Sequence, residues 1–215
     1  MYEAINKGLQ ACKGEIVSYL SCDEQYLPGT LDFAVRYLQT HPDADGFFGD
    51  TLVTRPDGQF AAFRKSYKPF WPLIGVSTLY VFPSSMFLRR TIIDNGERFD
   101  TRFKARGDVE FVIRLLRKGY RVRNTRRYLS SFTLTGHNLG QSDLARREDE
   151  LLQSLLPTWV VRYGGPLNIT RLILKVASGA YFERPPLRYA IYAFGADQRR
   201  VTFQAQYLSQ KWPQS

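Results

Sequence analysis

The sequence predicts an α/β protein, with a mostly parallel β-sheet flanked by helices and then a helical tail rich in basic and aromatic residues. Helix-like and strand-like patterns alternate through residue 134, which is typical of α/β folds. The strongest helix, Asp108–Lys118, has acids in its first turn, bases in its last turn and Gly119 after it. From Thr158 onward, eight Lys/Arg stand against two acids. We therefore predict an α/β domain over 1–142 and a helical extension over 143–215.

The first elements are predicted as helix, strand and helix. Apolar residues recur at helical spacing in Tyr2–Lys13, and Gly14 provides a C-terminal stop. Ile16–Leu20 is rich in β-branched and aromatic residues, which favours a strand. A second helix is predicted over Gly29–Gln39, since Pro42 follows it and proline cannot continue a helix.

The rest of the chain contains short strands, helices and turn signals. The α/β part is predicted to have strands at Gly46–Thr54, Gln59–Arg64, Ser85–Arg89, Arg121–Asn124 and Tyr128–Leu134, with helices at Thr91–Asn95 and Asp108–Lys118. An amphipathic helix is predicted over Asp143–Leu156, and two more in the tail at Arg171–Lys175 and Tyr189–Phe194.

The charge and cysteine content narrow the class of partner and compartment. A net charge of +10 and a pI near 9.7 favour an anionic partner: nucleic acid, an anionic membrane surface or a phosphate-bearing substrate. Two cysteines fit a reducing compartment, so we expect a cytoplasmic protein. The N-terminal residues lack a signal-peptide pattern, and the longest uncharged stretch, Pro69–Met86, is broken by three prolines.

Three acidic features are candidates for a site, because they are predicted at strand ends or helix starts. Asp23-Glu24 follows a predicted strand, where paired carboxylates suit a divalent cation held against phosphates. A solvated turn with Asp23 as a helix cap explains this pair equally well. Asp108 at a helix start can serve as a general base, although an N-cap aspartate is the more common explanation. Asp50 is the third such acid.

Several short motifs occur in an order that resembles family 2 glycosyltransferases, which are inverting enzymes of the GT-A fold. The motifs are YEAINKG at 2–8, ACKGEI at 11–16, LSCDE at 20–24, FGD at 48–50, FLRR at 87–90, FD at 99–100 and GDVEFVIRL at 107–115. The resemblance covers about residues 2–142. It implies transfer of a sugar from a nucleotide-diphosphate donor to a glycan or lipid-linked acceptor hydroxyl, in cell-surface polysaccharide synthesis.

The resemblance also implies roles for individual residues. Asp23 and Glu24 correspond to the carboxylates that hold Mg²⁺ or Mn²⁺ and the donor diphosphate, with Glu24 in place of the usual aspartate. Asp108 corresponds to the catalytic base that deprotonates the acceptor hydroxyl. Asp50 and Glu110 are candidates to contact the acceptor or to support the residues around it.

Three further residues are implied on the donor side. Asn6 and Lys7 correspond to a helix that lines the nucleotide, although Lys7 is equally well explained as a solvated lysine at a helix end. His137, followed by Asn138 and Ser142, resembles a late histidine near the diphosphate. A lone histidine is usually a polar surface residue, so this assignment rests on the resemblance alone.

The family's first strand, helix and second strand have no counterpart before Tyr2, so we expect this chain alone to be inactive or weakly active. Two other classes stay open: an inactive remnant or non-catalytic binding module, and a basic nucleic-acid-binding protein. No helix-turn-helix, RNP-like strand or zinc-ligand spacing is found, so we expect no nucleic-acid partner. We expect the basic tail, Thr158–Ser215, to lie on an anionic membrane, at its inner face.

Overall fold

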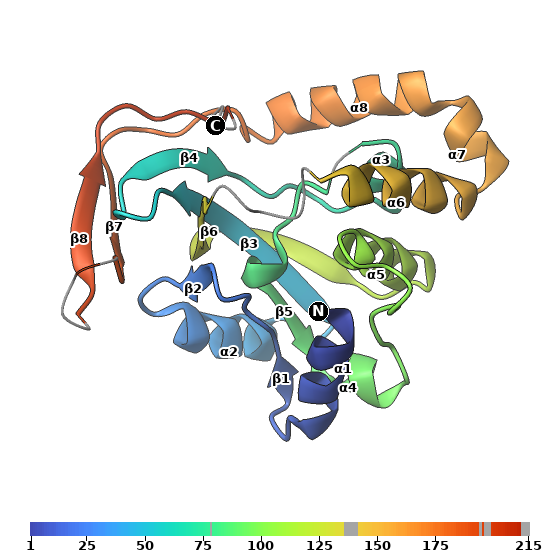
Figure 1. The fold of residues 1–215 in the computed structure, drawn as a ribbon, viewed down its shortest axis with the longest axis horizontal. Coiled ribbons are helices and arrows are strands. Elements are labelled where there is room, and N and C mark those ends of the chain that lie inside the picture. The colour runs from blue at the N-terminus through green and yellow to red at the C-terminus, as the bar shows by residue number, and fades with distance from the viewer. Residues whose placement is uncertain (78, 136–141, 194, 196–198, 212–215) are drawn as a thin grey trace.

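A computed structural model describes residues 1–77, 79–135, 142–193, 195 and 199–211 (Figure 1). Its centre is a six-stranded sheet in the order β1–β5–β3–β6–β2, with β4 also paired to β3. The strands are β1 (Ile16–Val17), β2 (Glu24–Tyr26), β3 (Gly46–Thr54), β4 (Phe60–Arg64), β5 (Met86–Arg89) and β6 (Val122–Thr133). The predicted α/β class, a central sheet flanked by helices, is confirmed.

The pairing directions show how the sheet is built. The longest pairing, β3 with β6, is parallel and runs from Gly46–Val122 to Thr54–Thr133. Around this parallel centre, the shorter pairings β1–β5, β2–β6, β3–β4 and β3–β5 are antiparallel. The parallel contact is therefore the core of the sheet, and antiparallel strands extend it on both sides.

Strand β3 is buried along its whole length because both faces of the sheet are covered. Phe47 packs on one face with Ala34 and Leu38, while Phe48 packs on the other, as the two-residue repeat of a strand requires. Gly49 lets β6 approach closely, since a Cβ there would lie 2.2 Å from the Leu129 side chain.

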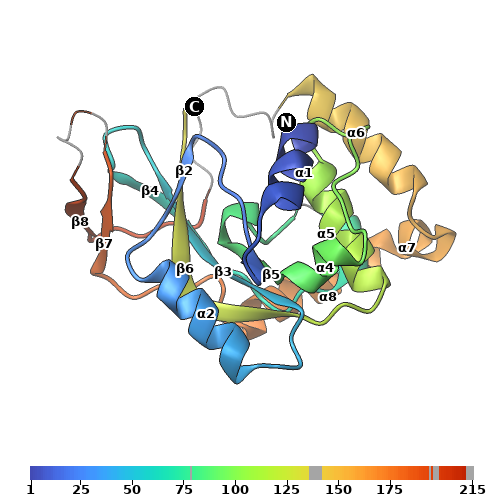
Figure 2. The same cartoon turned by 90° about the horizontal axis from the view of Figure 1, so that it is seen from below.

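The helices of the α/β part divide between the two faces (Figure 2). α2 (Thr30–Thr40) covers the Phe47 face. α1 (Tyr2–Ala11), α4 (Arg90–Asp94) and α5 (Gly107–Arg117) pack around the larger core on the Phe48 face. The short α3 (Trp71–Gly75) and the 3-10 helix η1 (Pro83–Ser85) lie in the long segment between β4 and β5. All the described helices are too short or too polar to serve as a bilayer-spanning segment.

Four predicted elements differ from the structure. The predicted strand Ile16–Leu20 is ordered as a strand only at Ile16–Val17, and Glu24 opens β2. The two strands predicted between 121 and 134 form the single strand β6. The helix predicted over Tyr189–Phe194 is wrong for Tyr189–Ile191, which belongs to strand β7 (Leu187–Ile191). Strand β7 pairs antiparallel with β8 (Val201–Ala205). The burial of side chains alternates along β7, which is typical of a strand and not of a helix.

The C-terminal part packs closely on the α/β part. It comprises α6 (Asp143–Ser154), α7 (Thr158–Arg162), α8 (Gly164–Ala177), β7 and β8. Tyr189 and Ile191 share a buried cluster with Leu27 and Leu52. The Tyr189 hydroxyl donates to the Gly58 carbonyl at 2.8 Å. The predicted helical extension is thus helical in its first half and two-stranded in its second.

Candidate active site

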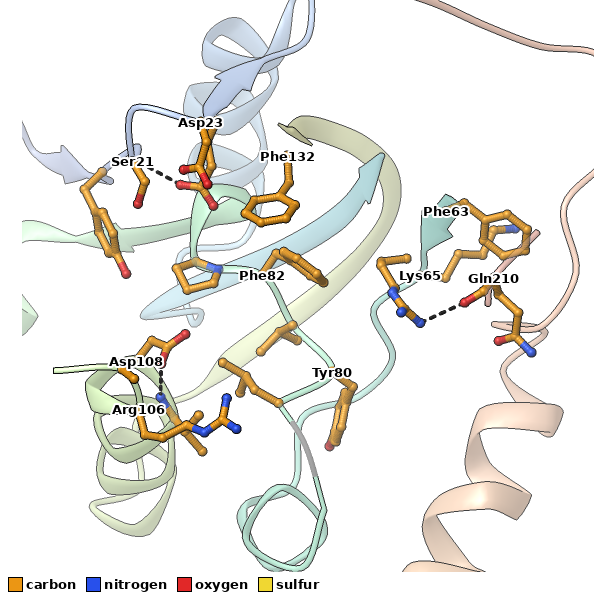
Figure 3. Close-up of a pocket in the computed structure, with 18 of the residues that line it drawn as sticks. Ser21, Asp23, Phe63, Lys65, Tyr80, Phe82, Arg106, Asp108, Phe132 and Gln210 are labelled. Carbon is orange, nitrogen blue, oxygen red and sulfur yellow. Dashed lines mark hydrogen bonds between the residues drawn. The ribbon is translucent and has the colours of Figure 1, made fainter. Parts of the chain in front are cut away.

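A cavity of about 690 Å³ lies between the sheet, the start of α5 and the C-terminal segment (Figure 3). Its charged lining residues are Asp23, Glu24, Arg64, Lys65, Arg106, Asp108, Arg171 and Lys175. In Figure 3, Asp23 and Asp108 lie on one side of the cavity and Lys65 lies on the other, with Phe82 and Tyr80 between them. The structure therefore brings Asp23-Glu24 and Asp108, two of the three predicted acidic features, together in one cavity.

Asp108 is held at the start of α5 by Tyr2 from α1. Its Oδ1 accepts hydrogen bonds from the Tyr2 hydroxyl at 3.2 Å and from the Val109 N–H at 2.9 Å. Burial raises the pKa of Asp108, while those two hydrogen bonds oppose the rise. A carboxylate with a raised pKa is a stronger base than an exposed aspartate, which suits proton abstraction near neutral pH.

Asp23, in the turn before β2, and Glu24, the first residue of β2, both line the cavity. The Ser21 N–H donates to the Glu24 carboxylate at 2.8 Å, and the Thr133 N–H donates to the Asp23 carbonyl at 2.7 Å. The first bond fixes the turn, and the second ties the acid pair to the end of β6. Burial is the largest influence on Glu24 and raises its pKa, so its negative charge is poorly solvated.

Tyr19 lines the same cavity, within electrostatic reach of Asp108 and Glu24. Burial raises its pKa first, and the charges of Asp108, Tyr2 and Glu24 raise it further. Its ring packs edge-on against Phe99, with 5.4 Å between the ring centroids. The Tyr19 hydroxyl is therefore neutral and can donate a hydrogen bond in the cavity.

The loop before α5 is fixed by Glu148 of α6. The buried Glu148 carboxylate accepts hydrogen bonds from the N–H groups of Lys104, Ala105 and Arg106 at 2.6 to 2.8 Å. Arg106 in turn forms a bidentate ion pair with Asp149, at 2.7 and 2.9 Å. The helical extension thus holds the backbone that presents Arg106 and Asp108 to the cavity.

The opposite wall is basic, and sequence reasoning did not identify it. It combines Arg64 and Lys65 at the end of β4 with Arg171 and Lys175 from α8. The only sequence signal was the i, i+4 spacing of Arg171 and Lys175, which places both on one face of a helix. Its meeting with β4 is a tertiary contact that no local pattern contains.

Several predicted site residues lie outside the cavity lining. The Asn6 side chain donates to the Phe99 carbonyl at 2.8 Å and accepts from the Phe99 N–H at 2.9 Å. Lys7 is exposed and pairs with Glu3 at 2.9 Å. Glu110 pairs with Arg114 at 2.7 Å. These contacts make Asn6 and Glu110 supports of the surrounding structure.

Asp50 is also outside the cavity, in the middle of β3, not at a strand end as expected. It is 1% exposed and accepts from the Ser66 N–H at 2.7 Å. Ser66 stands between Lys65 and Tyr67, which both line the cavity. Asp50 therefore holds the backbone at Ser66, between two residues of the basic wall, from the side away from the cavity. His137 lies outside the described residues.

The acid pair fits a divalent cation that also binds phosphate. No group of three or more His, Cys, Asp or Glu in the described ranges could hold a metal by itself. Mg²⁺ in proteins is commonly held by one or two carboxylates, with substrate phosphates and water completing its shell. Asp23 and Glu24 supply two such carboxylates, and a cation would offset the cost of burying Glu24.

Comparisons with known proteins show likeness in overall shape. No protein-family model and no curated protein sequence matches the chain. It is similar to the crystal structure of S. aureus TarS 1–349, with 13% identity, a TM-score of 0.49, and coverage of 96% of this chain and 79% of that one. The complex of TarS 1–349 with UDP has 14% identity and a TM-score of 0.48, covering 91% and 76%. A longer TarS structure has 12% identity and a TM-score of 0.49, and 93% of this chain matches 47% of it.

Proposed function

We propose that the chain is a glycosyltransferase that moves a sugar from a nucleotide-diphosphate donor to an acceptor hydroxyl with inversion. The observation that carries this proposal is the meeting of Asp108 with Asp23 and Glu24 in one cavity. The ordered motifs that resemble family 2 glycosyltransferases provide independent support from the sequence.

In this proposal Asp108 is the catalytic base. The acceptor oxygen forms a bond to the anomeric carbon while the bond from that carbon to the diphosphate oxygen breaks. The acceptor's proton passes to the Asp108 carboxylate, and the nucleoside diphosphate leaves. The raised pKa of Asp108 favours this transfer, and the Tyr2 hydroxyl fixes the direction in which the carboxylate points.

Asp23 and Glu24 are proposed to hold Mg²⁺ or Mn²⁺ together with the diphosphate. The cation would neutralise negative charge on the leaving diphosphate. The hydrogen bond from the Ser21 N–H fixes the Glu24 side chain, so one of its oxygens is oriented before any ligand binds. The Tyr19 hydroxyl, in the same cavity, can donate to a phosphate or sugar oxygen.

The test is release of nucleoside diphosphate from a panel of nucleotide sugars, with and without Mn²⁺. We expect Asp108→Asn to lower turnover by about 10²–10⁴-fold, the usual contribution of a general base. It should leave binding of Mg²⁺–pyrophosphate unchanged in calorimetry. Asp23→Asn with Glu24→Gln should abolish that binding, and the exposed Asp32→Asn is the matched control.

Two outcomes would contradict the proposal. Unchanged turnover in Asp108→Asn would show that Asp108 is not the catalytic base. Mg²⁺–pyrophosphate binding without turnover for any donor would indicate a non-catalytic binding module instead.

We also propose that the acceptor is a glycan or lipid-linked chain reached at the inner membrane surface. The supporting observation is the apolar outer face of α8, where Ile169, Ile173 and Val176 are 56–61% exposed. With a net charge of +10, such a face suits an anionic bilayer.

Flotation with phosphatidylglycerol vesicles and with phosphatidylcholine vesicles tests this contact. Ile169→Ser with Ile173→Ser should abolish binding to the anionic vesicles. Leu31→Ser with Val35→Ser, two exposed apolar positions on α2, is the matched control. Unchanged flotation of the α8 variant would remove the proposal. Deleting the whole tail is unsuitable, because Tyr189 and Ile191 belong to the buried core.

A further inference from the structure

Helix α8 is oriented opposite to an ordinary surface helix. A helix on the surface of a domain usually turns its apolar stripe inward and its charges outward. In α8 the half-buried positions include Asn168, Arg171 and Lys175, whereas Ile169 and Ile173 are exposed. None of its residues is fully buried. Figure 1 shows α8 along the outer edge of the molecule, beyond β4 and α3. Its inner face therefore supplies cations to the cavity.

These cations repel one another in the absence of a ligand. Burial lowers the pKa of Lys175, and the charges of Arg64 and Arg171 lower it further. Neither Arg171 nor Lys175 forms an ion pair within the described part of the chain. Arg171 donates to the Asn168 side chain at 2.9 Å, and the Lys175 ammonium lies 4.3 Å from the Tyr181 ring centroid. An anion in the cavity would relieve this repulsion.

The basic wall also contains an unsatisfied polar atom and an aromatic stack. The buried Gln210 Oε1 has no hydrogen-bond partner among the described residues, whereas the buried Tyr67 hydroxyl interacts with the Arg171 guanidinium. Tyr67 stacks on Tyr80 with 4.0 Å between ring centroids and 7° between ring planes. Buried polar atoms are normally satisfied, so the Gln210 oxygen marks a place for a hydrogen-bond donor of a ligand. Tyr67 is only 2% exposed, so the half-buried Tyr80 ring is the part of this stack that can offer an apolar surface to a sugar ring.

We infer that the basic wall binds an anionic acceptor, a glycan that carries phosphate or carboxylate groups, while one of its hydroxyls reaches Asp108. This inference rests on the proposed function, because it names the acceptor class for that same cavity. Arg171 and Lys175 bind the anionic group, and Gln210 Oε1 accepts a hydrogen bond from a hydroxyl of the glycan.

The alternative occupant of the basic wall is the donor diphosphate. Asp23 is on the opposite side of the cavity from Lys65, and the side chains of Phe82 and Tyr80 stand between them (Figure 3). A cation at the acid pair would hold the diphosphate there, which leaves the basic wall to a second anion. The two assignments predict different losses when the wall is neutralised.

The test measures binding of three trisaccharides by calorimetry: maltotriose, maltotriose phosphate and trigalacturonic acid. Wild-type protein should bind at least one anionic trisaccharide ten times more tightly than maltotriose, and this preference should fall as salt is raised. The better of the two anionic probes distinguishes phosphate from carboxylate. In the double variant Arg171→Gln with Lys175→Gln, the ratio of the affinity for the anionic trisaccharide to that for maltotriose should fall at least tenfold. Its affinity for Mg²⁺–pyrophosphate should stay unchanged.

The matched control, Lys13→Gln with Arg36→Gln, removes the same charge from exposed positions outside the cavity and should keep the preference. Thermal unfolding checks that each variant is folded, and Lys175→Gln alone serves if the double variant is not. No anionic preference in the wild type, or a preference that survives neutralisation, would overturn the inference. Loss of pyrophosphate binding in place of saccharide binding would overturn it too.

Failure of the proposed function is recognised separately. If the wild type transfers no sugar and binds no Mg²⁺–pyrophosphate, but neutralising α8 abolishes the anionic preference, the proposed function fails and the anionic site stands.

Discussion

Replacing Asp50 by Asn should make the protein less sensitive to pH. Asp50 is buried in β3, and its Oδ2 has no hydrogen-bond partner in the described structure. Burial raises its pKa from the ordinary value of 3.8 to about 6, although the bonds from Ser66 and the charge of Lys65 oppose the rise. The folded state therefore holds this proton more tightly than the unfolded state does.

The sign follows from linkage. Well below pH 3.8 the side chain is neutral in both states, so its titration has no effect on the free energy of unfolding. As the pH rises through about 6, the folded state loses its proton and is destabilised. With each pKa unit equal to roughly 1.4 kcal/mol, the full cost is about 3 kcal/mol above pH 7. About half of it develops between pH 5 and pH 7.5.

Asn keeps the acceptor for the Ser66 N–H and carries no charge. Urea unfolding of the wild type and of Asp50→Asn should therefore give a difference that grows by about 1.5 kcal/mol from pH 5 to pH 7.5, in favour of the variant. Asp50→Leu separates charge from anchoring, because it also removes the Ser66 acceptor and should loosen the wall at Lys65 and Tyr67. A stability difference that is constant over this pH range would refute the reasoning.

Three further changes test the acidic side of the cavity. Tyr2→Phe removes a hydrogen bond that lowers the pKa of Asp108, so the acidic limb of the pH–rate profile should move to higher pH; an unmoved limb would contradict this. Glu148→Gln should cost about 2–3 kcal/mol in urea unfolding, because an amide cannot accept all three N–H bonds, whereas the exposed Glu150→Gln should change little. Gly107→Ala would place a Cβ 2.6 Å from the Tyr2 ring, so both turnover and melting temperature should fall; a neutral result would show that the ring moves freely.

Elements with agreeing local signals were predicted closely from the sequence. The helix predicted over Asp108–Lys118 is found at Gly107–Arg117, where dipole charges and the C-terminal glycine point to the same boundaries. Strand β3 matches its predicted range, Gly46–Thr54. In both cases the pattern of apolar residues and the turn residues agree, so local preference and tertiary packing favour the same element.

Where tertiary contacts decide the structure, the local patterns were wrong. After Val17 the Ser18 hydroxyl donates to the Met86 carbonyl at 2.6 Å, so side-chain bonding replaces the predicted strand. The sequence predicts two strands where β6 is continuous, because the middle of β6, Thr125 to Arg127, is polar. The aromatic run at Tyr189 becomes a strand because β8 lies beside it.

The same distinction applies to the candidate site. Asp23, Glu24 and Asp108 were identified because each belongs to a contiguous motif. The basic wall has no such motif, since its cations come from β4 and from α8, about a hundred residues apart in the chain. Asp50 was recognised as an unusual acid, but only the three-dimensional structure shows that it faces Ser66 and not the cavity.

The cavity is closed by residues from nearly both ends of the described chain, Tyr2 and Gln210. Between them, Glu148 fixes the loop that presents Asp108, and the Phe63 N–H donates to the Ser209 carbonyl at 2.9 Å. During synthesis, the sheet and α5 can therefore form while the cavity is still open on one side. The lining of the cavity is completed only when the segment around Gln210 has left the ribosome and docked, so we expect the cavity to form after most of the sheet and α5 have folded.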